Sequence, residues 1–119
     1  MDNYKINDVL FALRKSDFRN SFHLKEKDKK YVQEKGMDTI LEHTYNFINN
    51  RIAPKVIEND GKQTPTKGHP VFIAQHATAC CCRGCIEKWH HIPKGRAFNK
   101  SEIDYIADVI MTWIWREMG

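Results

Sequence analysis

Residues 99–114 read NKSEIDYIADVIMTWI, and this stretch sets the fold class that we expect. Asn99 and Glu102 have the spacing of a capping box, in which each side chain accepts a hydrogen bond from the other residue's backbone N–H group. Apolar residues then recur at the spacing of one helix face: Ile103, Ile106, Ala107, Ile110, Trp113 and Ile114. The pattern predicts a long core helix that continues nearly to the end of the chain.

Upstream, residues 38–53 carry a second apolar stripe at helical spacing. Asp38 is expected to cap this helix, which should end before Pro54 because proline cannot continue a helix. Its stripe comprises Ile40, Leu41, Thr44, Phe47 and Ile48. We expect this helix and the one that follows Asn99 to supply most of the core.

Two further helices are predicted nearer the N-terminus. Asn7 can cap the first of them, whose apolar residues are Val9, Leu10 and Leu13. The segment Lys25 to Lys35 is highly charged, so it is predicted to be a peripheral helix that stops at Gly36.

Residues 55–70 lose all periodicity and are expected to form a long loop. Asn59-Asp60-Gly61 is a turn signal, and Pro65, Gly68 and Pro70 oppose regular structure. Structureless connections of this length are uncommon and tend to be functional. The apolar run 71–77 that follows is either a short strand or a buried helix, and its pattern does not decide between them.

Size and composition favour one domain over residues 1–119, with a small, mainly α fold. A chain of 119 residues is long enough for one apolar core and too short for two. The net charge of +4 is compatible with phosphate-bearing partners, but it falls short of the imbalance typical of dedicated nucleic-acid binders.

The four cysteines lie too close together to close useful disulfide loops: Cys80, Cys81, Cys82 and Cys85. The chain has no apolar run long enough to span a membrane, and its first residues do not resemble a signal peptide. We therefore expect a cytoplasmic protein with no membrane partner, whose cysteines stay reduced and serve chemistry.

Zinc binding is the chemistry that this cluster predicts, because thiols and imidazoles are the ligands that zinc prefers. Cys82, Cys85 and His90 match the spacing of the first three ligands of a zinc knuckle. The fourth knuckle position is Gly95, so a complete knuckle is excluded. The fourth ligand is left open among His76, His69, His91, another of the cysteines, and water.

Helix geometry restricts this prediction, since Cys85 and His90 would be about 140° apart on one continuous helix. Because Gly84 permits a tight turn, we expect the helix to begin only after Cys85. Two alternatives stay open. The cysteines can pack as small hydrophobic residues, or the C-x-x-C unit of Cys82 and Cys85 can carry thiol chemistry. No βαβ pattern of a thioredoxin-like site precedes it.

A short basic turn, Lys94-Gly95-Arg96, lies between two predicted helices and could contact phosphate groups, with Arg83 and Lys88 nearby in sequence. Ordinary surface cations explain this turn equally well. The function is then either a metal-supported module that binds nucleic acid or another macromolecule, or an enzyme that uses an open zinc position or Cys82 as a nucleophile. No recognised catalytic signature separates the two, and the oligomeric state is not predicted.

Several longer motifs lie between residues 60 and 105. They read DGKQTP at residues 60–65, GHPVFIAQHAT at 68–78, CCRGC at 81–85, KWH at 88–90, IPKG at 92–95 and EIDY at 102–105. In these motifs the sequence resembles the bacterial domain-of-unknown-function family 4186, whose name implies no activity. The resemblance marks Cys80 and His91 as departures from the family pattern. It leaves as candidate metal ligands His76, Cys81, Cys82, Cys85 and His90.

Overall fold

Helix α7 (Lys100–Met118) forms the centre of the molecule, and the computed structural model describes residues 3–119 around it. The predicted capping box is present: Glu102 N donates to Asn99 Oδ1 over 2.8 Å, and Asn99 N donates to Glu102 Oε1 over 2.9 Å. The buried face of the helix comprises Ile106, Ala107, Val109, Ile110 and Ile114. Within residues 3–119 the chain forms helices and no strand, so the prediction of a mainly α fold is confirmed.

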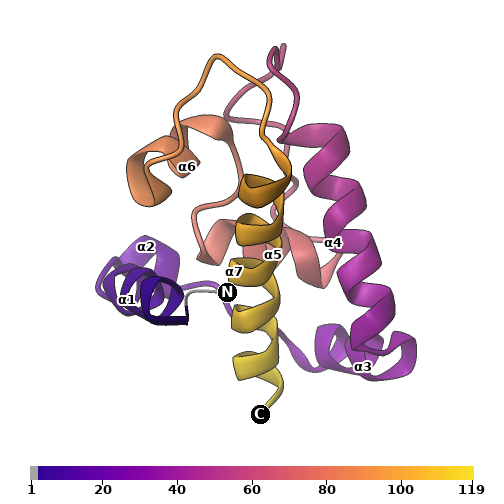
Figure 1. Ribbon diagram of the computed structural model, residues 1–119. Helices are drawn as coiled ribbons and strands as arrows, with labels where there is room; N and C mark the ends of the chain where they lie inside the picture. Colours follow the sequence, from indigo (N-terminus) through magenta and orange to yellow (C-terminus); the bar gives the residue numbers. More distant parts are fainter. Residues whose placement is uncertain (1–2) are drawn as a thin grey trace.

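Helix α4 (Met37–Arg51) lies alongside α7 (Figure 1). Most of the buried apolar residues lie outside these two helices, so the expectation that the two helices supply most of the core is wrong. Ile40, Thr44 and Ile48 are fully buried, as their spacing predicts. The prediction that Asp38 caps this helix is wrong, because Asp38 lies in its first turn and Gly36 is the residue before the helix. Gly36 adopts a φ of 85°, a conformation that favours glycine, and thereby ends the preceding helix and starts α4.

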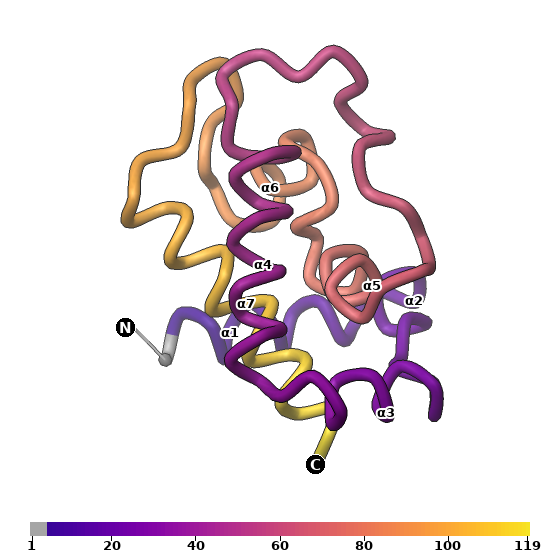
Figure 2. Tube along the Cα trace, turned by 90° about the vertical axis from the view of Figure 1, so that its right-hand side faces the viewer, coloured from indigo at the N-terminus to yellow at the C-terminus, as the bar shows by residue number. Residues whose placement is uncertain are grey.

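The first three helices of the chain lie on two sides of this pair, as Figures 1 and 2 show. They are α1 (Asn3–Arg14), the single-turn α2 (Asp17–Asn20) and the charged, peripheral α3 (Glu26–Lys35). Asn7 was predicted to cap the first helix, which is wrong because α1 begins at Asn3. The Asn7 side chain instead accepts a hydrogen bond from Arg116 of α7.

The undecided run 71–77 belongs to a buried helix, α5 (Pro70–Ala77), which packs against α7. His69 caps it, since its Nδ1 accepts a hydrogen bond from Val71 N over 3.0 Å. Helix α6 (Arg83–His90) follows after a connector, residues 78–82. The expectation that this helix begins after Cys85 is wrong: Cys82 is its N-cap, and Gly84 and Cys85 lie in its first turn.

Two long connections, residues 52–69 and 91–99, arch over the same end of the molecule and meet there (Figures 1 and 2). Phe98 N donates to the carbonyl of Ala53 over 2.9 Å. The two connections lie around the start of α6, and this is where the cysteines lie. Among the described helices, none is long and apolar enough to cross a membrane.

Candidate metal centre

Three of the four cysteines come together at the start of α6. The Sγ atoms of Cys81, Cys82 and Cys85 all lie within 4.8 Å of one another. Cys81 and Cys82 end the connector from α5, and Cys85 lies in the first turn of α6. Because Cys82 is the N-cap, its Sγ accepts a hydrogen bond from Cys85 N over 3.4 Å, so the helix start itself brings two of the sulfurs together.

Arg83 fixes this helix start from within the protein. Its side chain is 3% exposed and donates to backbone carbonyls of both long connections. The acceptors are Ile52 (3.1 Å), Ala53 (3.5 Å), Pro54 (3.1 Å), Pro93 (2.9 Å) and Arg96 (2.7 Å). The guanidinium also lies 4.0 Å from the centre of the Phe98 ring. Arg83 therefore ties the chain together and, contrary to our expectation, is not available to contact phosphate.

The connector 78–82 is held by buried polar groups. Thr64 Oγ1 donates to the carbonyl of Cys81 over 2.8 Å, and Gln75 Nε2 donates to the carbonyl of Cys80 over 3.1 Å. Ala79 is completely buried and has a φ of 58°, which is uncommon for a residue with a Cβ atom. The backbone that presents the thiols is thus held in a specific, strained conformation.

Arg19 completes the site from the other end of the chain. Its guanidinium donates to the carbonyl of His76 (2.7 Å), to Cys81 Sγ (3.6 Å) and to Cys85 Sγ (3.1 Å), and the residue is 8% exposed. Burial alone lowers the pKa of Arg19, but the hydrogen bonds and charges of the two sulfurs outweigh it and leave the pKa raised. Arg19 is therefore a permanent cation beside the thiols. No motif in the sequence links α2 to the cysteines, so sequence reasoning missed this residue.

The three thiols differ in acidity because they share hydrogen bonds. The hydrogen bond from Cys85, together with Arg19, lowers the pKa of Cys81 to about 7, against the effect of burial. The same hydrogen bond raises the pKa of Cys85, and burial adds to this effect. Burial also raises the pKa of Cys82. Cys81 is thus the first of the three to ionise, and the Cys85 thiol keeps its proton and donates a hydrogen bond to the Cys81 sulfur.

Cys80 points away from this group into the core. It is completely buried, and burial raises the pKa of its thiol to about 12, so it is neutral at physiological pH. Its Sγ donates to the carbonyl of Thr78 over 3.6 Å. Cys80 behaves as a small hydrophobic residue, which agrees with its place as a departure in the family resemblance.

His90, a predicted ligand, contacts Thr78 and Tyr105 rather than the three sulfurs. Its Nε2 lies 2.8 Å from the carbonyl of Thr78, and its Nδ1 lies 2.8 Å from the hydroxyl of Tyr105. Because a carbonyl can only accept, Nε2 carries the proton and Nδ1 accepts from Tyr105. Burial lowers the pKa of His90 to about 4, so the ring is neutral. The structure does not bring His90 into the group of three sulfurs.

His76, also a predicted ligand, lies close to the cysteine connector but outside the group of three sulfurs. Its Nε2 is 3.1 Å from the carbonyl of Thr64, the residue whose hydroxyl holds Cys81, and its ring stacks on Phe22 at a centroid distance of 5.4 Å. Since Nε2 must donate to this carbonyl, Nδ1 keeps a free lone pair. The other two histidines considered as ligands serve elsewhere: His69 caps α5, and His91 ends α6 with a φ of 60° and is exposed.

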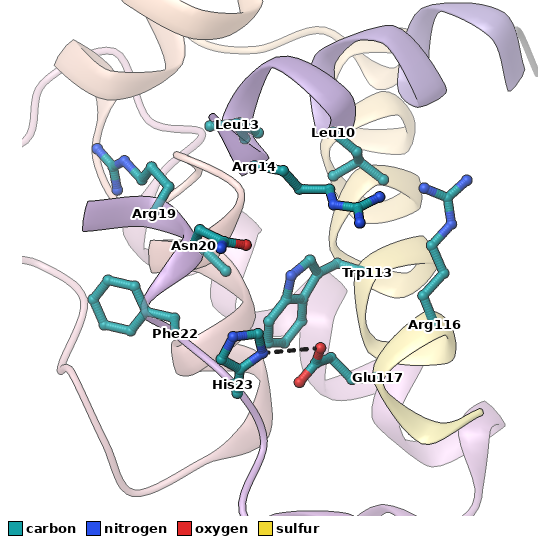
Figure 3. Close-up of a pocket in the computed structure, with 11 residues that line it drawn as sticks. Leu10, Leu13, Arg14, Arg19, Asn20, Phe22, His23, Trp113, Arg116 and Glu117 are labelled. Carbon is teal, nitrogen blue, oxygen red and sulfur yellow. Dashed lines mark hydrogen bonds and ion pairs between the residues drawn. The ribbon is translucent and has the colours of Figure 1, made fainter. Parts of the chain in front are cut away.

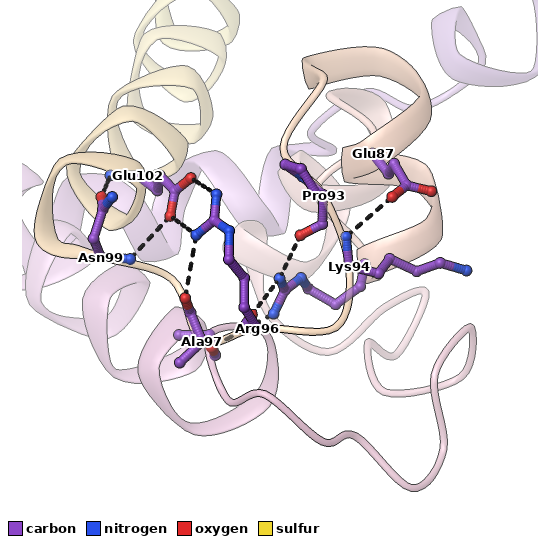
Figure 4. Close-up of polar contacts among 9 residues, drawn as sticks. Glu87, Pro93, Lys94, Arg96, Ala97, Asn99 and Glu102 are labelled. Atoms are coloured by element: carbon purple, nitrogen blue, oxygen red, sulfur yellow. Dashed lines mark hydrogen bonds and ion pairs between the residues drawn. The ribbon is translucent and has the colours of Figure 1, made fainter.

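The basic turn 94–96 lies at the surface, and Figure 4 shows its contacts. Arg96 forms a two-pronged ion pair with Glu102, with distances of 2.7 and 2.5 Å, so its charge already has a partner. Lys94 is held through its backbone, whose N–H donates to Glu87 over 3.0 Å, while its side chain extends away from Arg96 (Figure 4).

Fold and site together define a small helical protein that presents three thiols and a buried arginine at the start of one helix. The chain belongs to the DUF4186 family, a domain of unknown function, whose family model matches residues 7–115. The resemblance seen in the sequence motifs is thereby confirmed. No solved structure matches the chain.

Proposed function

We propose that the protein binds one zinc ion through the thiolates of Cys81, Cys82 and Cys85. The observation that carries this proposal is the gathering of three Sγ atoms within 4.8 Å of one another. In a tetrahedral site with Zn–S bonds of about 2.3 Å, two sulfurs lie about 3.8 Å apart. The sulfurs therefore need to approach one another by about an ångström or less, which side-chain rotation can supply.

The charge balance of this end of the molecule supports the proposal. Three thiolates and a Zn²⁺ ion carry a net charge of −1, and burying an unbalanced charge is costly. Arg19 supplies the opposite charge, and its N–H groups already point at two of the sulfurs. Hydrogen bonds to ligating atoms orient the ligands and tune their basicity, so Arg19 would contribute to affinity without touching the ion.

The fourth position distinguishes a structural role from a catalytic one. His76 can supply it through Nδ1, because its Nε2 proton is held by Thr64. Water in this position would leave the site open, as in catalytic zinc sites. His90 could join the ion only by leaving Thr78 and Tyr105. We therefore propose His76 or water as the fourth ligand.

Elemental analysis tests the proposal. Protein purified without an affinity tag or added metal should contain about one zinc per chain, as a single tetrahedral site requires. Cys82→Ser and Cys85→Ser should lose most of it, whereas Cys80→Ser is the matched control and should keep it. The proposal would be refuted if the protein as purified contained less than about a tenth of an equivalent of zinc and all four thiols reacted fully with a thiol reagent.

Thiol exchange is a second candidate, favoured by the hydrogen bonds of Arg19 to Cys81 and Cys85. A thiolate of Cys81 would attack a low-molecular-weight disulfide, releasing one thiol and forming a mixed disulfide. Cys85 would then attack this bond and release the second thiol. Two protein thiols are thus oxidised to one disulfide while the small disulfide is reduced. Incubation of zinc-free protein with oxidised glutathione should then consume two thiols, and Cys85→Ser should stop at the mixed disulfide.

Nucleic-acid contact through the turn 94–96 stays a separate proposal. Lys94 is exposed and its side chain points away from Arg96 (Figure 4), whereas Arg96 must leave Glu102 to reach a phosphate. Lys94→Ala should therefore reduce salt-sensitive retention of DNA or RNA more than Arg96→Ala does. Absence of retention even at low ionic strength would refute this contact.

A further inference from the structure

A hollow of about 300 Å³ lies between α1, α2 and α7, separate from the zinc ligands proposed above (Figure 3). This volume is at the lower end of the range for small-molecule sites. Leu10, Leu13 and Ala77 give it an apolar wall. The side chain of Arg19 also contributes to the wall, although its guanidinium contacts the cysteine sulfurs.

Two arginines from different helices reach this hollow. Arg14 is the last residue of α1 and Arg116 lies in the last turn of α7; both are exposed, and Figure 3 shows both side chains at its rim. Arg116 donates to the neutral side chain of Asn7. Within the described residues, no carboxylate forms an ion pair with either arginine. Two like charges are thus held at the same hollow without an opposite charge between them.

Glu117 is the acidic residue among the described residues that line the hollow, and its carboxylate already has two partners. Glu117 Oε1 accepts from Leu24 N over 2.9 Å, and Glu117 Oε2 lies 3.3 Å from His23 Nδ1. The carboxylate therefore holds the connector between α2 and α3 against α7. Because three arginines and one carboxylate line the hollow, it has an excess of positive charge that a phosphate can neutralise through charge-assisted hydrogen bonds.

An aromatic ring lies beside the cations. The indole of Trp113 is half-buried and faces the centre of the hollow, and the amide of Asn20 points toward it from α2 (Figure 3). A flat ring beside arginines is the arrangement on which nucleobases stack. A side-chain amide offers both a donor and an acceptor to the polar edge of a base.

We propose that this hollow binds a nucleoside phosphate, with the phosphate between Arg14 and Arg116 and the base on Trp113. Asn20 pairs with the edge of the base. The nucleotide is either free or one unit of a single-stranded nucleic acid, because both present the same phosphate and base. This inference does not depend on zinc binding.

The test is a calorimetric titration of the full-length protein with deoxyadenosine monophosphate and with a single strand of six deoxyadenosines. Arg14→Gln and Arg116→Gln should each weaken binding about tenfold, the effect of losing one charge-assisted hydrogen bond. Lys15→Gln removes the same charge from the neighbouring residue and should leave binding unchanged. Arg14→Lys should restore part of the loss, and thermal unfolding followed by circular dichroism should show that every variant folds.

The possible outcomes distinguish the sources of the ligand. Mononucleotide binding that both glutamine variants weaken supports a free nucleotide, and strand binding alone with the same dependence supports a nucleic acid. Inorganic phosphate that binds as tightly as the mononucleotide overturns the proposed role of Trp113. Absence of binding to both probes at millimolar concentration, or binding that Lys15→Gln weakens as much as the arginine variants do, overturns the proposal.

Discussion

The guanidinium of Arg19 lies 3.1 Å from the sulfur of Cys85, although 66 residues separate them in the chain. This contact joins α2 to the start of α6 and places a fixed cation beside the cysteine group. Arg19 thereby adds a positive charge to this end of the molecule, which the cysteines alone would not supply. Metal binding and thiol chemistry would both depend on it, because both need sulfur in the thiolate form.

Replacing Arg19 should therefore weaken the proposed zinc site without removing a ligand. We expect Arg19→Met to lower zinc affinity about 10- to 100-fold, as removal of hydrogen bonds to ligating atoms typically does. Competition with a chromogenic chelator measures the affinity. Lys15→Met, the loss of a nearby surface cation, is the control. Equal affinity of Arg19→Met and the wild-type protein would show that Arg19 serves the fold alone.

Arg83 is expected to contribute to stability rather than to binding. Arg83→Met removes the donors for five backbone carbonyls and should lower the free energy of unfolding by about 3 to 5 kcal/mol, the range for breaking a buried charged network. Urea unfolding of the zinc-free protein gives this value. Lys88→Met, one turn further along α6 and exposed, should change it by less than about 0.5 kcal/mol. A loss for Arg83→Met no larger than that of the control would contradict the assigned role.

The elements with strong local signals could be predicted from the sequence. The capping box of Asn99 and Glu102 and the apolar spacing of α4 and α7 are local patterns, and the structure confirms both except at Leu41, which is exposed. The stop at Gly36 is also local, because its φ of 85° suits glycine. In contrast, residues 71–77 could not be assigned, since a short run that is apolar on all sides has no period. Its burial on nearly every face explains why.

The site could be predicted only in part, because its contacts are long-range. The crowding of Cys81, Cys82 and Cys85 is visible in the sequence, and the structure brings them together. The start of α6 was misjudged, since the N-cap role of Cys82 depends on a thiol accepting a backbone hydrogen bond, which is an uncommon cap. Arg19 could not be predicted as part of the site, because its partners follow from how α2 packs on α5 and from how its side chain reaches Cys85 of α6.

Acid should destabilise the protein through His90. Burial lowers the pKa of this ring to about 4, whereas it ionises near pH 6.5 in the unfolded chain. The unfolded state therefore takes up the proton first, so stability is intact above pH 6.5 and is lost as the pH falls from 6.5 toward 4. The loss should be about 3 kcal/mol in the zinc-free, reduced protein.

His90→Gln tests this assignment, because glutamine can still donate to Thr78 and accept from Tyr105 but does not titrate. The variant should show a shallower loss of stability between pH 6.5 and 4, measured by urea unfolding with a chelator and a reductant present. His91→Asn is the control, since His91 is exposed and asparagine tolerates its positive φ. A wild-type slope in His90→Gln would assign the acid sensitivity to another group, such as His69, whose pKa burial also lowers to about 4.

Removal of the proposed zinc should loosen one end of the molecule and leave the core intact. The ion would tie Cys81 and Cys82 of the connector to Cys85 of α6, whereas α4 and α7 are held by buried isoleucines that do not depend on it. Hydrogen exchange read by mass spectrometry should therefore accelerate in residues 78–90 after chelation, while residues 102–114 of α7 keep their protection.

Reloading with zinc should reverse the change, and Cys85→Ser with and without chelator should show no difference. Equal acceleration in α7 would mean that the ion supports the whole fold, and no change in residues 78–90 would mean that the three sulfurs do not hold it.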